Sequence, residues 1–333
     1  MQDRYGHRIS YLRVSITDRC NERCTYCMPQ ELQEWLPRED ILSYEETLRL
    51  IRVAVNLGVS RVRITGGEPL TRRDVLQFMR ALAKIEHLRD IGLSTNGTLL
   101  AREIEPGLTM AGALRAAGVR TVNISLDTLD RQVYAAITGR DFHSHVLNGI
   151  DAAIAAGFDQ IKLNCVLMRG RNEDQFLPLI EFAGSRNLIL RFIELMPVST
   201  NEVLDECNFL SISEAKRAIE SCYGGLMPEA EFRTNGPATY YQVPGRNQRV
   251  GFIGAMTNLH FCENCNKLRL TCDGKLRPCL GSYLEFDIMT PLRTGASDAD
   301  LRQFFLDVVD RKPKEHDFRN SYQPNRKMIA IGG

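Results

Sequence analysis

Short β-like segments alternate with amphipathic helical segments between residues 10 and 195, and this alternation limits the chain to few folds. The strand candidates lie at residues 10–17, 59–67, 90–97, 119–127, 160–168 and 190–197. The first helical pattern opens with Ser43 and Glu46 in capping-box spacing and ends at Gly58. Alternating strands and helices predict a parallel sheet with helices outside it. Because the units are too few for a closed (β/α)8 barrel, we expect an α/β protein with a partial (β/α)6 TIM-like barrel, and a doubly wound open sheet is the second choice.

The predicted strands carry a polar face where a filled barrel would be apolar. In the first strand, Leu12, Val14 and Ile16 alternate with Arg13 and Ser15, and the strands at 59–67, 119–127 and 160–168 alternate likewise. The helices must cover the apolar face, so the polar face lines the lumen, where unpaired charges are costly. We therefore expect a large, polar, anionic ligand in the lumen. An antiparallel sheet with one solvated face is the alternative, which the intervening helices disfavour.

Small and polar motifs follow the strands at their C-terminal ends, where (β/α) barrels form their active sites. They are a three-cysteine segment after the first strand, TGGEP at 65–69, STNG at 94–97, SLD at 125–127 and ELMP at 194–197. STNG alone is more often a tight turn. Their shared position at one rim favours a site.

The ten cysteines are grouped. Three lie at Cys20, Cys24 and Cys27, and another set comprises Cys262, Cys265 and Cys279. We expect the isolated Cys165, Cys207 and Cys222 to be small buried hydrophobic residues. The net charge of +1, the lack of a membrane-length apolar run and the polar residues 1–10 predict a cytoplasmic protein with no nucleic-acid or membrane partner. In that compartment, disulfides are not expected.

Thiolate sets of this kind suit zinc or an iron–sulfur cluster. A [4Fe–4S] cluster normally takes four thiolates, so the spacing C-x3-C-x2-C leaves one iron open to a substrate. No histidine lies between Asp18 and Pro37 to complete a zinc site there. In the second set, Cys272 adds a fourth cysteine, and a four-cysteine zinc ribbon remains open on spacing alone.

The segment CNERCTYCMP at 20–29 resembles the cluster loop of the radical S-adenosylmethionine (SAM) superfamily. The resemblance implies a partial barrel and a [4Fe–4S] cluster on Cys20, Cys24 and Cys27 whose open iron chelates SAM. It also implies formation of a 5′-deoxyadenosyl radical. The TGGEP motif resembles the superfamily segment that meets the amino group of SAM.

The segment FCENCNKLRLTCDGKLRPCLG at 261–281 resembles the C-terminal cluster loop of the GTP 3′,8-cyclase family. WLPREDILSYEE and RFIELMPV are similar to this family as well. The resemblance implies a second [4Fe–4S] cluster on Cys262, Cys265 and Cys279. It implies conversion of GTP to (8S)-3′,8-cyclo-7,8-dihydro-GTP, a lyase reaction that begins molybdenum cofactor biosynthesis. The chain departs from the family at Cys272, usually a small residue, and at Lys267, usually Arg, where bidentate hydrogen bonding is lost.

The same resemblance assigns the site residues. The expected SAM site comprises Tyr26, Gly67, Ser125 and Met196. The expected GTP site comprises Arg13, Arg63, Thr95, Lys162, Arg191, Lys267, Leu268 and Arg269. Arg13 and the C-terminal Gly332 and Gly333 are expected to be catalytic, with the tail reaching into the active site. Without the resemblance, each of these basic side chains is expected to be a salt-bridge partner, and the C-terminal tail is expected to be a disordered terminus.

We expect a radical SAM barrel over residues 1–205 and a C-terminal α+β region over 206–333 that binds the second cluster and closes the barrel mouth. The expected partners are GTP, a low-potential electron donor of flavodoxin or ferredoxin type, and cyclic pyranopterin monophosphate synthase, which takes the product. A homodimer is left open. The alternative functions are a radical SAM enzyme that modifies peptides and a zinc-ribbon interaction protein on a barrel scaffold.

Overall fold

The computed structural model describes residues 1–28, 34–198, 207–320, 322 and 326–332. Most of its strands form one twelve-stranded sheet with the order β14-β13-β12-β1-β2-β3-β6-β7-β8-β11-β10-β9, and β4 pairs with β5 separately. The strands are β1 Tyr11–Ser15, β2 Arg61–Thr65, β3 Asp90–Thr95, β4 Glu103–Glu105, β5 Leu108–Thr109, β6 Thr121–Ser125, β7 Gln160–Leu167, β8 Ile189–Glu194, β9 Met227–Pro228, β10 Thr239–Gln242, β11 Arg249–Ile253, β12 Lys267–Leu270, β13 Lys275–Arg277 and β14 Phe286–Asp287.

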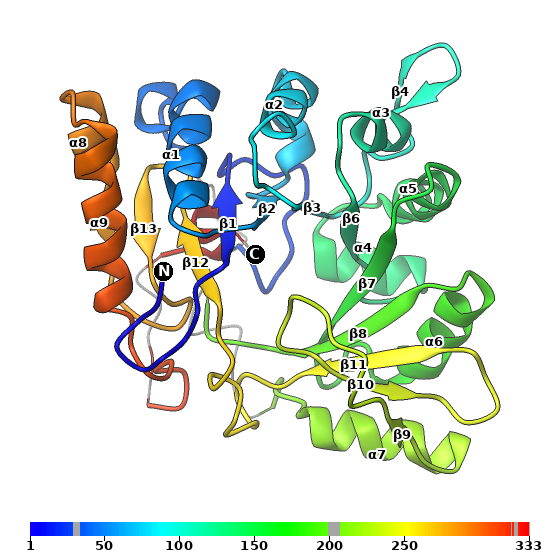
Figure 1. Ribbon diagram of the computed structural model, residues 1–333. Helices are drawn as coiled ribbons and strands as arrows, with labels where there is room; N and C mark the ends of the chain where they lie inside the picture. The colour runs from blue at the N-terminus through cyan, green and yellow to red at the C-terminus, as the bar shows by residue number, and fades with distance from the viewer. Residues whose placement is uncertain (29–33, 199–206, 321, 323–325, 333) are drawn as a thin grey trace.

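The predicted strands are all present, as β1, β2, β3, β6, β7 and β8. Each runs parallel to the next one in chain order. Figure 1 shows the sheet bent into an open arc with α1, α2, α5 and α6 along its outer side. The strand order has two free ends within the described residues, so the arc is not a closed ring. The partial (β/α)6 barrel is confirmed.

Half of the ten described α-helices begin at a Ser, Thr or Asp whose side chain accepts from an amide of the first turn. The helices are α1 Tyr44–Asn56, α2 Val75–Leu82, α3 Met110–Ala116, α4 Arg131–Thr138, α5 His143–Ala155, α6 Phe176–Ser185, α7 Ile212–Tyr223, α8 Met289–Arg293, α9 Asp298–Asp310 and α10 Met328–Ile331. The predicted capping box of α1 is confirmed: the Glu46 amide donates to Ser43 Oγ at 3.1 Å, and the Ser43 amide donates to the Glu46 carboxylate at 2.7 Å. Such a cap stabilises a helix by about 1 kcal/mol. Among the described residues, no helix combines the length and apolarity needed to cross a bilayer.

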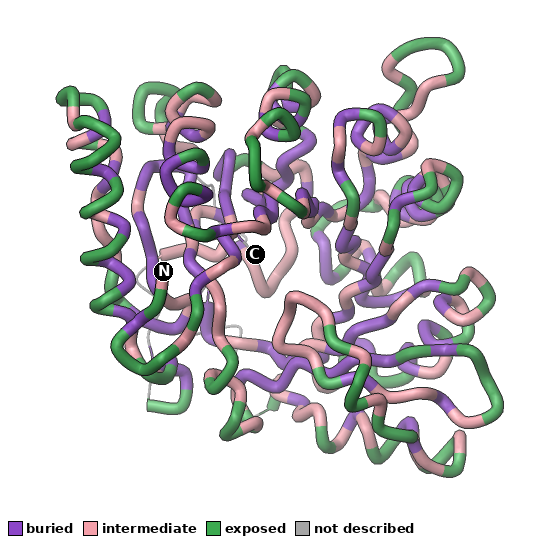
Figure 2. Tube along the Cα trace, in the orientation of Figure 1, coloured by how far each residue is buried: buried purple, intermediate pink, exposed green. Residues whose placement is uncertain are grey.

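The hydrophobic core lies between the outer face of the sheet and the helices. Leu12 and Val14 of β1 and Ile64 of β2 are fully buried there, against Leu50 and Ile51 of α1. Figure 2 shows the strands buried and the solvent side of the helices exposed. The apolar half of each alternating strand therefore packs outward, and the polar half is left to face the lumen.

The C-terminal part of the chain continues the barrel sheet at both of its edges. Strand β11 pairs in parallel with β8, and β12 pairs in parallel with β1. Antiparallel strands then follow on each side, β10 and β9 at one edge and β13 and β14 at the other. The boundary near residue 205 stays a prediction, because 199–206 lie outside the described residues.

The isolated cysteines differ in exposure. Cys165 is buried as expected, but Cys207 and Cys222 are exposed, so the prediction of burial is wrong for these two. Cys222 follows Ala215 and Ile219 on the buried face of α7, but it lies in the last turn of the helix, where this face is exposed.

Candidate active site in the barrel lumen

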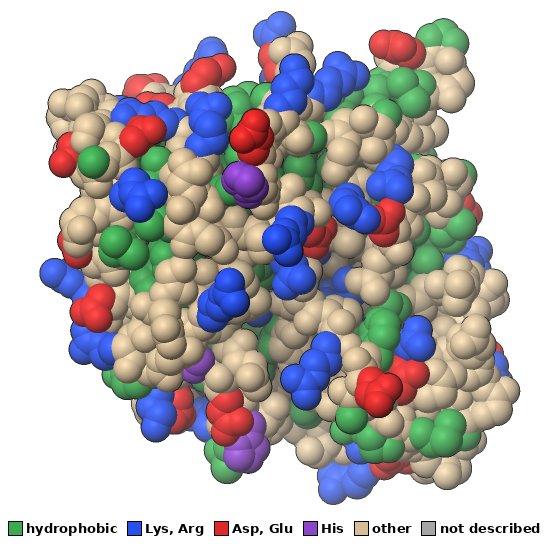
Figure 3. Space-filling model, viewed as in Figure 1, with side chains coloured by type: hydrophobic (Ala, Val, Ile, Leu, Met, Phe, Trp, Pro, Cys, Tyr) green, Lys and Arg blue, Asp and Glu red, His purple; other side chains and the backbone are tan. Residues whose placement is uncertain are grey.

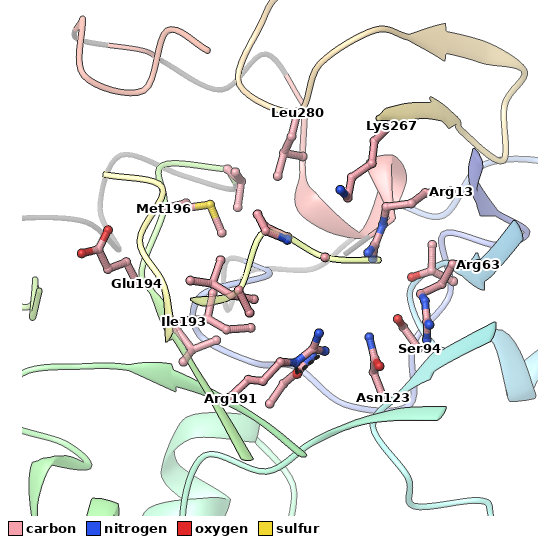
Figure 4. A pocket seen from close by; sticks show the side chains of 18 of the residues that line it. Arg13, Arg63, Ser94, Asn123, Arg191, Ile193, Glu194, Met196, Lys267 and Leu280 are labelled. Atoms are coloured by element: carbon pink, nitrogen blue, oxygen red, sulfur yellow. Dashed lines mark hydrogen bonds between the residues drawn. The ribbon is translucent and has the colours of Figure 1, made fainter. Parts of the chain in front are cut away.

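The lumen holds a cavity of about 840 Å³, and the inward-facing polar side chains of the barrel strands line it. In Figure 4, Arg13, Arg63, Arg191 and Lys267 point into this space from different strands, with Met196 on another wall. Figure 3 shows Lys and Arg side chains gathered around the hollowed centre of the face it views. The predicted polar lining of the lumen is confirmed.

Strand register sets three arginines side by side. Arg13 of β1 pairs with Arg63 of β2 and with Arg269 of β12. Burial, together with the neighbouring cations, lowers the pKa of Arg13 to about 10 and that of Arg269 to about 9. Within the described residues, neither Arg63 nor Arg269 forms an ion pair with a carboxylate. This row of buried positive charge suits a polyanionic ligand.

Neutral acceptors hold the guanidinium groups of Arg63 and Arg191 in place. Arg63 donates to the Tyr11 hydroxyl at 2.7 Å and to the Leu93 carbonyl at 2.8 Å. Arg191 donates to Asn164 Oδ1 at 2.6 and 2.9 Å. These bonds orient the side chains without neutralising their charge, so the charge remains available to a ligand.

Lys162 adds a buried amine to the same lumen. It is 4% exposed, and burial lowers its pKa to about 6, with Arg191 and Arg63 adding to the effect. Its Nζ donates to the amide oxygen of Gln160. Nearby on β6, the buried Oδ1 of Asn123 has no hydrogen-bond partner within the described part of the chain.

Cys20, Cys24 and Cys27 line the cavity just beyond the C-terminal end of β1. Burial raises the pKa of Cys20 to about 12, and it raises the pKa of Cys24 and Cys27 as well. Each thiol also feels the charge of another member of the set or of a nearby carboxylate. Thiolates at such positions are costly unless a metal compensates their charge.

The sequence left two kinds of metal site open for the cysteines, zinc and a [4Fe–4S] cluster. Among the described residues, no three His, Cys, Asp or Glu side chains converge closely enough to hold one metal ion. A zinc ion requires that convergence, whereas a [4Fe–4S] cluster takes each thiolate on a different iron. Both cysteine sets line the same cavity.

Buried carboxyl groups surround the first cysteine set. Glu68 is fully buried and accepts from Thr95 Oγ1 at 2.9 Å and from the Asn96 amide at 2.8 Å, and burial raises its pKa to about 7. Asp127 accepts from the Tyr26 hydroxyl at 2.8 Å, and burial raises its pKa to about 6. Glu22 contacts the Tyr134 hydroxyl, and burial raises its pKa to about 7.

The cavity is therefore polarised. Glu22 and Asp127 line the cavity beside the first cysteine set, the fully buried Glu68 acts on Cys20 nearby, and the arginine row lies on β1, β2 and β12. An acidic pocket favours a cationic ligand and an arginine row favours an anionic one. Glu68 and Asp127 lie within motifs that the sequence indicated, but neither was assigned a role from the sequence, and Glu22 was missed. The position of Glu22 between two ligand-type cysteines is the signal that could have identified it.

The second cysteine set lies at another part of the cavity wall. Cys262, Cys265 and Cys279 all line it. Burial opposes ionisation of Cys265, but Lys312 and Lys267 outweigh this and lower the pKa of that thiol. Lys312 and His316, which also line the wall, were missed by sequence reasoning because nothing local marks them.

Cys272 lies apart from that set. It is fully buried, does not line the cavity, and interacts with Ser15 and Asp18. The charges that act on it are those of Asp273, Asp18 and Arg326, and no other cysteine is among them. The structure does not bring together the four cysteines of a zinc ribbon.

The C-terminal tail contacts the barrel strands directly. Arg269 Nη1 donates to the Gly332 carbonyl at 2.7 Å. Gly332 has a φ of +85°, and a Cβ there would lie 2.7 Å from Thr65 Cγ2 and 3.0 Å from Ser15 Cβ. Only glycine fits this backbone and this space. The expectation for Gly333 falls outside the described residues.

The structure brings nearly all the sequence-predicted side chains to one cavity. Those that line it are Arg13, Tyr26, Arg63, Gly67, Thr95, Ser125, Lys162, Arg191, Met196, Lys267 and Arg269, with the cysteines of both sets. Leu268 and Gly332 are not part of this lining: the side chain of Leu268 is fully buried in the hydrophobic core on the other face of β12, and Gly332 packs against Thr65 and Ser15. Any role of Leu268 toward a ligand would belong to its backbone.

Comparison with known families divides the chain into two matching parts. Residues 14–183 match the Radical SAM superfamily, and residues 188–318 match the family described as Molybdenum Cofactor Synthesis C. Relatives match over the full length: GTP 3′,8-cyclase of Moorella thermoacetica is 45% identical over 333 residues and covers 100% of both chains. GTP 3′,8-cyclase of Ectopseudomonas mendocina is 45% identical over 335 residues, covering 99% of this chain and 98% of that protein.

Solved structures share the fold. Streptococcus suis SuiB bound to S-adenosylmethionine aligns with a TM-score of 0.61 at 15% identity, over 90% of this chain and 68% of that one. Native anSMEcpe with bound AdoMet aligns with a TM-score of 0.58 at 15% identity, over 97% of this chain and 87% of that one. At such identity the similarity concerns the fold alone.

Proposed function

This chain belongs to the GTP 3′,8-cyclase family of the radical SAM superfamily, and we propose that its polarised lumen holds SAM and GTP side by side for cyclisation of GTP. The chain is thus an enzyme of the first step of molybdenum cofactor biosynthesis. The observation that carries the proposal is one cavity that joins an acidic pocket, a row of arginines and two three-cysteine sets. The reaction converts GTP to (8S)-3′,8-cyclo-7,8-dihydro-GTP.

The acidic side of the cavity is the proposed SAM site. SAM carries an ammonium and a sulfonium group, and positive charge is favoured here by the carboxyl groups of Asp127, on the cavity wall, and of Glu68, fully buried beside the first cysteine set. Cys20, Cys24 and Cys27 would hold the first [4Fe–4S] cluster, which supplies the electron that cleaves SAM to a 5′-deoxyadenosyl radical. Tyr26, Gly67, Ser125 and Met196 line the adjoining wall.

A close approach of backbone explains Gly67. A Cβ at Gly67 would lie 2.4 Å from the Arg19 carbonyl oxygen in the cysteine loop. The Gly67 amide also donates to the Thr17 carbonyl at 2.8 Å. Gly67 therefore lets the cysteine loop pack against the end of β2. Its proposed role toward SAM is to position this loop.

The basic side of the cavity is the proposed GTP site. Arg13, Arg63 and Arg269 lie in one row, Arg191 extends the positive charge to β8, and Lys162 on β7 adds an amine whose protonation a bound triphosphate would favour. A triphosphate would neutralise this charge. Cys262, Cys265 and Cys279 would hold a second [4Fe–4S] cluster with one open iron for the guanine. The chain's residues hold and orient the nucleotide so that ribose C3′ and guanine C8 can join, and the enclosed lumen excludes water from a reactive radical.

Proton uptake tests the role of Lys162. Since the pKa of Lys162 is lowered to about 6 in the empty lumen, this amine is mostly neutral at pH 7.5. A bound triphosphate raises that pKa, so GTP binding should take up about one proton, and affinity should fall as pH rises above 6. Calorimetry of the reconstituted enzyme in buffers of different ionisation enthalpy measures the uptake. Lys162→Met should lose it, and unchanged uptake in this variant would contradict the assignment.

The proposal extends to partners and location. The cysteines of both sets are free thiols, and a reducing cytoplasm keeps such residues reduced. We place the enzyme there, with a flavodoxin- or ferredoxin-like electron donor, and with cyclic pyranopterin monophosphate synthase as the enzyme that takes the product. The peptide-modifying alternative leaves the arginine row unexplained, and the zinc-ribbon alternative lacks a convergent set of four cysteines.

Anaerobic turnover is the experiment for the proposed function. The reconstituted enzyme is incubated with SAM, a reductant and GTP, and the products are separated by liquid chromatography and mass spectrometry. We expect 5′-deoxyadenosine together with a cyclised nucleotide isomeric with GTP. Deoxyadenosine formation with GTP left intact would remove the substrate assignment.

A further inference from the structure

Lys312 is a buried lysine that lies two residues beyond α9. It is 3% exposed, and its Nζ donates to the Lys267 carbonyl at 3.2 Å and to the Pro278 carbonyl. In the described part of the chain, no carboxylate forms an ion pair with it. A buried ammonium normally requires a countercharge, and carbonyl oxygens supply only partial charge.

The two carbonyl partners connect the arms of the second cysteine set. Lys267 opens β12 two residues after Cys265, and Pro278 directly precedes Cys279. One ammonium therefore ties the Cys262–Cys265 arm to the Cys279 arm. Its positive charge also acts on all three thiols, whereas Lys267 and Arg269 each act on only some of them.

We propose that Lys312 is the positioning residue and the counter-charge of the second [4Fe–4S] site. This inference rests on the second cluster of the proposed function. Three thiolates give the oxidised cluster a net negative charge, and reduction adds another negative charge. A fixed buried cation beside the thiolates therefore favours both assembly of the cluster and its reduced state.

Iron content tests the positioning role in the full-length, anaerobically reconstituted chain. Lys312→Met should lower iron from about eight to about four atoms per chain while the first cluster persists. Lys312→Arg keeps the charge and should retain most of the iron. Lys314→Met is the matched control, because Lys314 is exposed two residues away. Circular dichroism checks whether each variant is folded.

Reduction of the second cluster tests separately whether Lys312 acts as a counter-charge. This test uses Lys312→Gln, so it does not depend on the folding of Lys312→Met. Lys312→Gln can still donate to a carbonyl but carries no charge. At a fixed reductant concentration, its electron paramagnetic resonance signal from the reduced second cluster should fall to about half or less of the wild-type signal.

Two failures can be told apart. Wild-type chain with about four irons would overturn the second cluster itself, and this inference with it. Wild-type, Lys312→Met and Lys312→Gln chains that all hold about eight irons and reduce alike would overturn the role of Lys312 while leaving the second cluster in place.

Discussion

Deletion of Gly332 and Gly333 is expected to abolish GTP cyclisation while both clusters remain. The Gly332 carbonyl accepts from Arg269, and the residue packs against Ser15 and Thr65 at the ends of β1 and β2. Deletion removes this contact and frees Arg269 from its position in the arginine row. Because small misplacements of reacting groups are costly, we expect a loss on the order of 100-fold or more in product formation.

The same truncated chain supplies the control for that deletion. Iron and sulfide content should equal those of the wild type, because the contacts that Gly332 makes within the described residues are with Arg269, Thr65 and Ser15 and not with the cysteine loops. SAM cleavage to 5′-deoxyadenosine should continue without matching GTP consumption. Substitution Gly332→Ala should reproduce the defect, since its Cβ would clash with Thr65 at a strained φ. Normal cyclisation by the truncated enzyme would refute a role for the tail.

Substitution of Cys279 by alanine should remove the second cluster, whereas the same substitution at Cys272 should not. Cys279 lines the cavity with Cys262 and Cys265, but Cys272 is buried beside Ser15. We expect Cys279→Ala to hold about four irons and to lose cyclisation. Cys272→Ala should hold about eight irons and show only a small loss of thermal stability, because a buried side chain is shortened.

This pair of variants decides which cysteines are ligands. Iron analysis and the visible absorbance of the reconstituted chains give the answer without an activity assay. Loss of iron from Cys272→Ala, or zinc in place of iron at the second set, would contradict this assignment and support a site with Cys272 as a fourth ligand.

Local sequence patterns predicted the barrel because its rules are local. The alternation of Leu12 and Val14 with Arg13 fixed which face of β1 points into the lumen, and the spacing of Ser43 and Glu46 fixed the start of α1. Parallel order then followed from the strand–helix alternation. The positions of Arg63 and Lys162 in the lumen needed no further information.

Contacts between distant segments could not be predicted in this way. That β12 pairs with β1 and β11 with β8 depends on nonlocal register, which no local pattern encodes. The same pairing sets Arg269 beside Arg13 and separates Cys272 from Cys265. Lys312 escaped notice because its partners are backbone carbonyls of residues far along the chain.

Transfer of deuterium from GTP to SAM-derived deoxyadenosine tests the central claim most directly. If the lumen holds the ribose C3′ against the SAM site, GTP deuterated at C3′ should yield 5′-deoxyadenosine heavier by one deuterium, alongside the cyclised nucleotide. GTP deuterated at C8 should yield unlabelled deoxyadenosine. Unlabelled deoxyadenosine from the C3′-deuterated substrate, or label arriving from C8, would contradict the account.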